Sequence, residues 1–257
     1  MPLKTWWRGA FEKGVYPLKS LENNLQWRTK TRRQVVFLKK VLGLRPDSKV
    51  LDVACGQGRH ALLLAQGGCQ ATGVDISPVY LSEARKQAAR LKVKARFLRQ
   101  DMRRLRFRRE FDAAINMFSS FGYFSKAGDD LNVLRGIYAA LKPGGYFLLD
   151  TINGPRILRH FVANKWTEWS DGMLILEDCE LVRRKRAVKT RWIFIRNGYR
   201  KEMISLVRMY DNKSLGRLLK KAGFRIVRFY GETAVAPYRP LHSPRLVVLA
   251  QRPFDAK

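Results

Sequence analysis

The sequence predicts an α/β protein built on a doubly wound parallel sheet. Short apolar segments typical of strands alternate with helical segments between Lys49 and Asp150. Such alternation is typical of a parallel sheet that helices cover on both faces. The first apolar segment also runs directly into a glycine-containing loop, which is the usual position of a nucleotide-like ligand in such sheets.

The elements follow in a regular order. Residues 1–45 are predicted to form an N-terminal helical cap, because their apolar residues recur at helical spacing. The strands then predicted are Lys49–Ala54, Ala71–Asp75, Ala95–Gln100, Phe111–Met117 and Tyr146–Asp150. The helices between them are Arg59–Gln66, one opened by Ser77 and Pro78, and one over about 130–141.

The pattern changes after Thr151. Three strand-like segments with polar turns favour antiparallel hairpins: Met173–Val182, Val188–Arg196 and Glu202–Tyr210. Residues 151–210 are therefore predicted to form an antiparallel lid that projects over the carboxyl edge of the sheet. The alternation resumes with a helix over 214–222 and strands over 224–230 and 245–250. The sheet domain is thus expected to comprise residues 46–150 and 211–257.

Composition narrows the classes of protein. A chain of 257 residues with 46% hydrophobic residues can bury a full core. Its three cysteines, Cys55, Cys69 and Cys179, form no Cys-x-x-Cys pair, so we expect neither a disulfide framework nor a metal site. The sequence lacks an apolar run of transmembrane length and a signal-peptide core, so a cytoplasmic protein is expected.

The charge is strongly basic. Lys and Arg number 51 and Asp and Glu 21, which gives a formal net charge of +30. Basic residues cluster at 28–33, 103–109 and 183–186. Such a surface attracts polyanions, which indicates RNA, DNA or an acidic membrane as a partner, or simply a well-solvated surface.

Considered alone, the glycine loop does not determine which cofactor binds. Gly56 to Ala61 fits the G-x-G-x-x-A form of a dinucleotide fingerprint, and Asp75 ends the next strand. Asp52, inside the end of the first strand, would repel a pyrophosphate but suits a ligand with an ammonium group. At the end of the third strand, Asp101 can accept from an adenine amino group and Met102 can pack on its ring.

These residues resemble the class I S-adenosylmethionine-dependent methyltransferases. The D-x-x-C-G-x-G loop at 52–58, the acidic ends of the second and third strands and the Leu-Lys-Pro-Gly-Gly turn at 141–145 stand in the family's order. The resemblance covers about residues 49–150. It implies a Rossmann-like sheet of seven strands with the last strand antiparallel, and S-adenosyl-L-methionine as cofactor in place of NAD.

The resemblance also implies which residues contact that cofactor. Asp52 would lie near its amino group, Asp75 would bind the ribose hydroxyls, and Asp101 would contact the adenine. The full implied set follows the ends of the first four strands: Asp52, Ala54, Cys55, Gly56, Gly58, Asp75, Ile76, Asp101, Met102, Asn116, Met117 and Phe118.

The segment after the fourth strand bears on the acceptor. It reads Asn-Met-Phe-Ser-Ser-Phe-Gly-Tyr-Phe over 116–124, without the Asn-Pro-Pro-Tyr that resemblance would link to methylation of base nitrogens. This run is similar to that of methyltransferases acting on small amines, including amino-sugar N-methyltransferases. A small-molecule acceptor methylated on nitrogen or oxygen is expected. The alternatives are a methyltransferase acting on RNA or a ribosomal component, and a non-catalytic binding or assembly factor with the same fold.

Methyl transfer from a sulfonium requires alignment of the acceptor more than a catalytic base. Tyr123 is the candidate catalytic residue, because a phenol in this loop can orient an amine, although it can equally pack against the lid. The candidate substrate residues are Tyr16, Tyr123, Trp166, Arg208 and Tyr210. The last three could instead hold the lid to the sheet. The sequence leaves the oligomeric state open.

Overall fold

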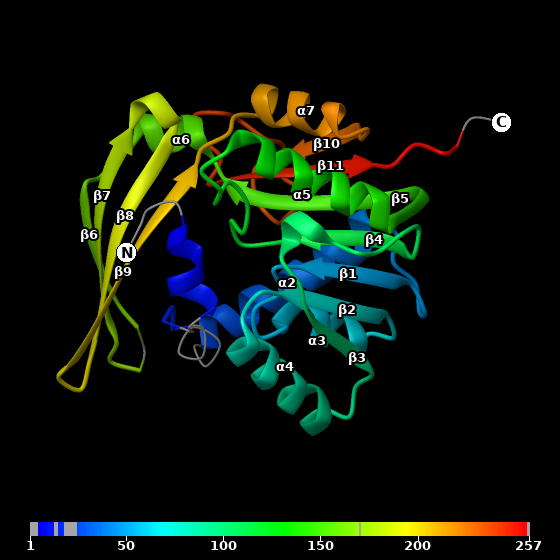
Figure 1. Ribbon diagram of the computed structural model, residues 1–257, viewed down its shortest axis with the longest axis horizontal. Coiled ribbons are helices and arrows are strands. Elements are labelled where there is room, and N and C mark those ends of the chain that lie inside the picture. The colour runs from blue at the N-terminus through cyan, green and yellow to red at the C-terminus, as the bar shows by residue number, and fades with distance from the viewer. Residues whose placement is uncertain (1–4, 13–14, 18–24, 170, 256–257) are drawn as a thin grey trace.

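The main sheet confirms the predicted fold class. The computed structural model describes residues 5–12, 15–17, 25–169 and 171–255 (Figure 1). Within these residues one sheet has seven strands in the order β10-β11-β5-β4-β1-β2-β3. Its strand bounds are β1 (Lys49–Val53), β2 (Gln70–Asp75), β3 (Ala95–Arg99), β4 (Phe111–Asn116), β5 (Leu141–Ile152), β10 (Arg225–Tyr230) and β11 (Arg245–Gln251). Only β11 runs antiparallel to its neighbours in this sheet, as expected.

Helices cover both faces of this sheet. Successive residues of a strand point to opposite faces, so each strand contributes side chains to the core on both sides. In β1, Val50 packs with one core cluster and Leu51 and Val53 with another. The first cluster includes residues of α2 (Leu25–Val41), α3 (Arg59–Gln66) and α4 (Pro78–Arg90). The second includes residues of α5 (Ala127–Ala140) and α7 (Asn212–Lys221). No helix in the described part of the chain is long and apolar enough to cross a membrane.

A second sheet forms the lid. Its four antiparallel strands are β6 (Asn164–Glu168), β7 (Leu174–Val182), β8 (Ala187–Arg196) and β9 (Tyr199–Arg208), and a short helix α6 (Gly154–Arg159) connects it to β5. Strand β6 is absent from the sequence prediction, because all five of its residues are exposed and their pattern does not alternate. Figure 1 shows this sheet beside the carboxyl ends of β1, β4 and β5, with the N-terminal segment between them.

The N-terminal segment is anchored to both sheets. Its described part contains a π-helical turn, η2 (Arg8–Glu12), and then α2; residues 1–4, 13–14 and 18–24 of the predicted cap lie outside the described residues. The Trp6 indole Nε1 donates to the Leu206 carbonyl of β9 at 3.2 Å. Because Trp6, Trp7 and Ala10 are buried, this segment is part of the core between lid and sheet.

The start of strand β5 differs from the sequence prediction. Strand β5 begins at Leu141, not Tyr146, because the Lys-Pro-Gly-Gly segment pairs with the chain after β11. The Gly144 amide donates to the Arg252 carbonyl at 3.0 Å, and the Arg252 amide donates to Gly145 at 2.8 Å. The Arg252 guanidinium also donates to the Tyr138 carbonyl at 3.0 Å, which satisfies an acceptor in the last turn of α5.

Candidate cofactor and acceptor site

A cavity of about 440 Å³ lies where the carboxyl ends of the main sheet face the lid. The glycine loop, the loop after β4, the N-terminal segment and the inner face of the lid all contribute to its lining. This is the crevice that binds ligands in open α/β sheets.

The glycine loop after β1 has several residues in the left-handed region of backbone conformation, which glycine adopts readily. Ala54, Gly56 and Gly58 all have positive φ angles, of 57°, 57° and 81°. A Cβ at Gly58 would lie 2.6 Å from the Phe97 ring, so only glycine fits where α3 begins. Ala54, Cys55 and Gly56 line the cavity, whereas Gly58 shapes the turn without lining it.

Asp75 holds the glycine loop against the end of β2. Its Oδ2 accepts from the Gly56 amide at 2.9 Å and its Oδ1 accepts from the Ser77 amide at 2.9 Å. Burial raises the pKa of this carboxyl, and the backbone donors oppose that rise. Each carboxylate oxygen keeps a lone pair, so Asp75 can accept from a ligand hydroxyl while it positions the loop.

Asp52 is an unusual group, because its carboxyl is buried and incompletely hydrogen-bonded. It is 2% exposed, and its Oδ2 has no partner among the described residues. Burial raises its pKa to about 7, although the nearby Arg59 charge and a hydrogen bond from the Ala61 amide oppose the rise. A buried carboxylate oxygen in a cavity wall fits a cationic group such as an ammonium.

Asp101 is engaged within the protein. Arg103 donates to Asp101 Oδ2 through its guanidinium at 2.6 Å, and its amide donates to Oδ1 at 3.0 Å. Burial would raise the pKa of Asp101, but the hydrogen bonds from Arg103 outweigh it and the pKa is lowered. Asp101, Met102 and Ile76 all line the cavity, as the resemblance implies.

The loop after β4 is held in a conformation that non-glycine residues adopt rarely. Phe118 and Ser119 have φ angles of 60° and 64°. The Phe118 amide donates to Asp150 Oδ2 at 3.1 Å, and the Ser119 amide donates to the Asp150 carbonyl at 3.0 Å. Arg245 donates from Nε to Asp150 Oδ1 at 2.7 Å and from its terminal nitrogen to Ser119 Oγ at 2.8 Å.

The sequence prediction missed Asp150, which holds the loop after β4, and Arg245, which lines the cavity. A signal was present, since Asp150 follows the apolar run of β5 much as Asp75 follows that of β2. Met117, Phe118 and Arg245 line the cavity.

Asn116 was predicted at the cofactor but does not line the cavity. It is fully buried, and its Nδ2 donates to the Val53 carbonyl at 2.9 Å. This hydrogen bond joins the ends of β4 and β1, so Asn116 positions both loops that follow them.

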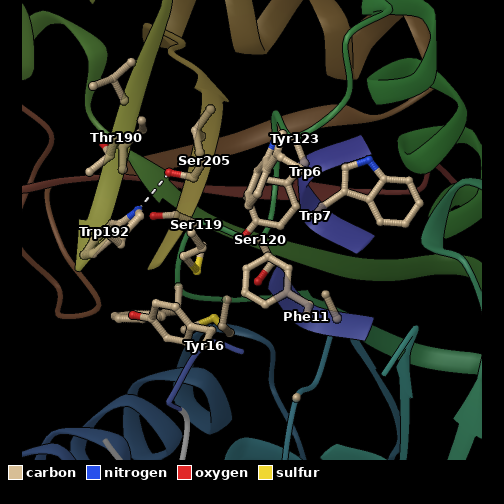
Figure 2. A pocket seen from close by; sticks show the side chains of 18 of the residues that line it. Trp6, Trp7, Phe11, Tyr16, Ser119, Ser120, Tyr123, Thr190, Trp192 and Ser205 are labelled. Atoms are coloured by element: carbon tan, nitrogen blue, oxygen red, sulfur yellow. Dashed lines mark hydrogen bonds between the residues drawn. The ribbon is translucent and has the colours of Figure 1, made fainter. Parts of the chain in front are cut away.

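Aromatic side chains form one wall of the cavity. Tyr123 lies 4.9 Å from Trp6 and 5.6 Å from Phe11 between ring centroids, and Figure 2 shows these rings together. Tyr16 also lines the cavity, and the Tyr80 hydroxyl donates to its carbonyl at 2.8 Å. Burial raises the pKa of Tyr123 well above its usual value, so its phenol remains a neutral donor. Trp6 and Phe11 were not predicted, because their role depends on the docking of the N-terminal segment.

The lid contributes the opposite wall through its strand register. Cys179, Thr190 and Ser205 are aligned across β7, β8 and β9, and so are Glu177, Trp192 and Met203. All six line the cavity. The Trp192 indole donates to Ser205 Oγ at 2.9 Å, and Figure 2 shows these two residues and Thr190 on the lid strands, across the pocket from Tyr123.

Three residues predicted to contact substrate do not line this cavity. Trp166 is 70% exposed on β6. Arg208 pairs with the fully buried Asp130 of α5, and the Tyr210 hydroxyl donates to the same carboxylate at 2.6 Å. Arg208 and Tyr210 therefore join the end of the lid to the main domain.

The fold and the cavity define a class. The sheet order with an antiparallel last strand, the tight glycine loop and the buried Asp52 oxygen fit S-adenosyl-L-methionine, whose ammonium group suits that oxygen. The ribose hydroxyls of this cofactor suit the remaining acceptor capacity of Asp75. The chain has the fold of the class I S-adenosylmethionine-dependent methyltransferases.

Comparison with known proteins agrees with this class. A family model described as a methyltransferase domain matches residues 50–145. A putative methyltransferase of Bacillus subtilis (strain 168) is 32% identical over 119 residues, which are 46% of this chain and 48% of that protein. A glycine/sarcosine N-methyltransferase of Aphanothece halophytica is 28% identical over 211 residues, 81% of this chain and 78% of that one.

A sugar methyltransferase and a solved structure extend the comparison. A dTDP-3-amino-3,4,6-trideoxy-alpha-D-glucopyranose N,N-dimethyltransferase of Streptomyces venezuelae is 35% identical over 104 residues, 40% of this chain and 42% of that enzyme. The alignment thus spans about half the length of several curated relatives. The crystal structure of an S-adenosylmethionine-dependent methyltransferase from Clostridium acetobutylicum ATCC 824 superposes with a TM-score of 0.76. It is 21% identical and shares the fold, covering 86% of this chain and 92% of its own.

Proposed function

We propose that the protein transfers a methyl group from S-adenosyl-L-methionine to a nitrogen or oxygen atom of a small-molecule acceptor. The observation that carries this proposal is one cavity lined both by the glycine loop and by the lid. Two of the similar proteins are named as a glycine/sarcosine N-methyltransferase and as an N,N-dimethyltransferase of a dTDP-linked amino sugar, which supports a small-molecule acceptor.

The side chains around the cavity suit this chemistry. The bound cofactor supplies an electrophilic methyl group on its sulfonium. Asp52 and Asp75 would hold its amino and ribose ends, and the backbone at Phe118 would define the other side of the donor. Tyr123, as a neutral phenol, would orient the acceptor, while Trp6 and Phe11 exclude water. Alignment and exclusion of water are the main requirements of an in-line displacement.

The cofactor half of the proposal is tested by calorimetric titration with S-adenosylhomocysteine. The unaltered protein should bind it, and Asp75→Ala should lose most of the affinity. Glu180→Gln, an exposed change on β7, is the matched control and should bind normally. Absence of binding, or equal binding by Asp75→Ala, contradicts the proposal.

The acceptor half is tested by methyl transfer from labelled cofactor to a metabolite extract and to total RNA in parallel. Label in the small-molecule fraction supports the proposal, and label only in RNA favours the alternative acceptor. No described residue of the basic clusters at 28–33, 103–109 and 183–186 lines the cavity, so these clusters do not support RNA as the acceptor at this site. Turnover with any acceptor excludes a non-catalytic binding factor.

A further inference from the structure

The inner face of the lid carries a carboxylate that the cofactor site does not use. Glu177 lies on β7, and alternation along that strand places it on the same face as Cys179. It is the only acidic side chain among the described lid residues that line the cavity. The acids expected to bind the cofactor, Asp52, Asp75 and Asp101, come instead from the ends of β1, β2 and β3.

Glu177 lacks a close partner within the described residues. No hydrogen bond or ion pair reaches its carboxylate there, although the charge of Lys165, opposite it on β6, acts on it. Burial raises the pKa of Glu177, and Lys165 only partly offsets that rise. A half-buried carboxylate without a partner is unfavourable, so a ligand that supplies a positive charge would gain from binding beside it.

Aromatic rings line the cavity on the same side as this carboxylate. Trp192 is aligned with Glu177 across the strands, and Tyr16 packs edge-on to Trp192 at 6.1 Å between ring centroids. The charge of Glu177 contributes to raising the pKa of Tyr16 to about 12, after the larger effect of burial. Aromatic faces beside a carboxylate are the surroundings that an organic ammonium group prefers.

We propose that the acceptor is a basic amine whose ammonium group binds against Glu177 on the inner face of the lid, an inference that rests on the methyltransferase function proposed above. The carboxylate and the Trp192 and Tyr16 rings would bind the cation, and the rest of the molecule would extend toward Tyr123. Before transfer the ammonium would give its proton to Glu177, so that the lone pair of the neutral amine forms the new bond to the methyl carbon as the bond from that carbon to sulfur breaks. Glu177 is then the residue that selects amines over neutral molecules of the same shape.

The test uses matched pairs of probes that differ only in charge. Phenethylamine and 2-phenylethanol, and cyclohexylamine and cyclohexanol, are titrated into the full chain saturated with S-adenosylhomocysteine, with tryptophan fluorescence as the signal. Each amine should bind at least about tenfold more tightly than its alcohol, as a charge-assisted contact implies. This first comparison requires no variant, so it stands even where a variant folds poorly.

Two variants then assign the preference to one carboxylate. Glu177→Gln should bind amine and alcohol alike, and its affinity for S-adenosylhomocysteine should be unchanged. Asp178→Asn makes the same change of charge at the adjacent exposed position on the opposite face, and it should keep the preference.

The outcomes separate this inference from the function on which it rests. Equal binding of amine and alcohol by the unaltered protein, no binding of either, or a preference that survives Glu177→Gln overturns the role of Glu177. If S-adenosylhomocysteine still binds in those cases, the methyltransferase proposal stands. Loss of S-adenosylhomocysteine binding by the unaltered protein overturns both.

Discussion

Asp52→Asn is expected to weaken binding of S-adenosylhomocysteine and to remove its pH dependence. The Asp52 carboxyl is buried, and burial raises its pKa to about 7. A cationic amino group placed beside it favours the ionised form and lowers that pKa. Binding should therefore release a proton wherever the free protein carries one on Asp52.

The magnitude follows from this pKa. With a value of about 7, about nine-tenths of the Asp52 carboxyls are protonated near pH 6 and about one quarter near pH 7.5. The affinity for S-adenosylhomocysteine should then rise about eightfold between these two pH values. The amino group of S-adenosylhomocysteine is that of a free amino acid, and its neighbouring carboxylate holds its pKa above that of a peptide α-amino group, about 7.7–8.0, so the ligand stays mostly charged at both pH values.

Calorimetry in two buffers of different ionisation enthalpy measures the protons released. The unaltered protein should release about 0.9 proton per ligand near pH 6. Asp52→Asn should release almost none, and Asp178→Asn should behave like the unaltered protein. Equal proton release by Asp52→Asn and the unaltered protein would refute the assignment of Asp52 to the amino group.

The Asp52 carboxyl should make the free protein less stable at neutral pH than at mildly acidic pH. Its folded-state pKa lies above the unfolded value, so the native state binds more protons between about pH 4 and 7. The contribution of Asp52 to the free energy of unfolding therefore falls as pH rises through this window and is level above it. Asp52→Asn should raise the free energy of unfolding in urea near pH 8, and a lower value there would contradict the burial of an unpaired charge.

Two further predictions concern pairs that hold the site in place. In a double-mutant cycle, Asp150→Ala and Arg245→Met should show a coupling energy of about 1.5–3 kcal/mol in urea unfolding, because they share a charge-assisted hydrogen bond; additive effects would show that the pair does not act as a unit. Arg208→Met should lower the free energy of unfolding by about 3–5 kcal/mol, because it leaves Asp130 buried with a single donor. It should not change S-adenosylhomocysteine affinity, and a change would place Arg208 in the binding machinery.

Much of the donor side of the site could be predicted from the sequence. The glycine loop, Asp52 and Asp75 lie at the ends of consecutive buried strands, and short-range spacing along the chain fixes their positions. Parallel strands bring their carboxyl ends to one edge of the sheet, so local pattern was sufficient. Asp150 also lies near the carboxyl end of a buried strand. Its role could be recognised only from its contact with Arg245, which depends on the antiparallel pairing of β5 and β11.

The acceptor side could not be predicted in the same way. Glu177 and Ser205 face the cavity only because of the register between lid strands, and a shift of one residue would turn each to the opposite face. Trp6 reaches the cavity through a hydrogen bond to Leu206, 200 residues away in sequence. Arg208 was assigned to substrate because its position at the end of the lid is compatible with either role, and only its partner Asp130 decides between them.

Acidic side chains line the cavity on both sides, from the main sheet and from the lid. Asp52 and Asp75 line the cavity from the main sheet, and Glu177 lines it from the lid. A cationic cofactor suits the first two, and a neutral acceptor would leave the half-buried Glu177 without a close partner among the described residues. A basic amine acceptor resolves this imbalance, because donor and acceptor then each bring a positive charge to a separate carboxylate. The carboxylates would also offset the repulsion between two cations held in one cavity, so that both can bind at the same time.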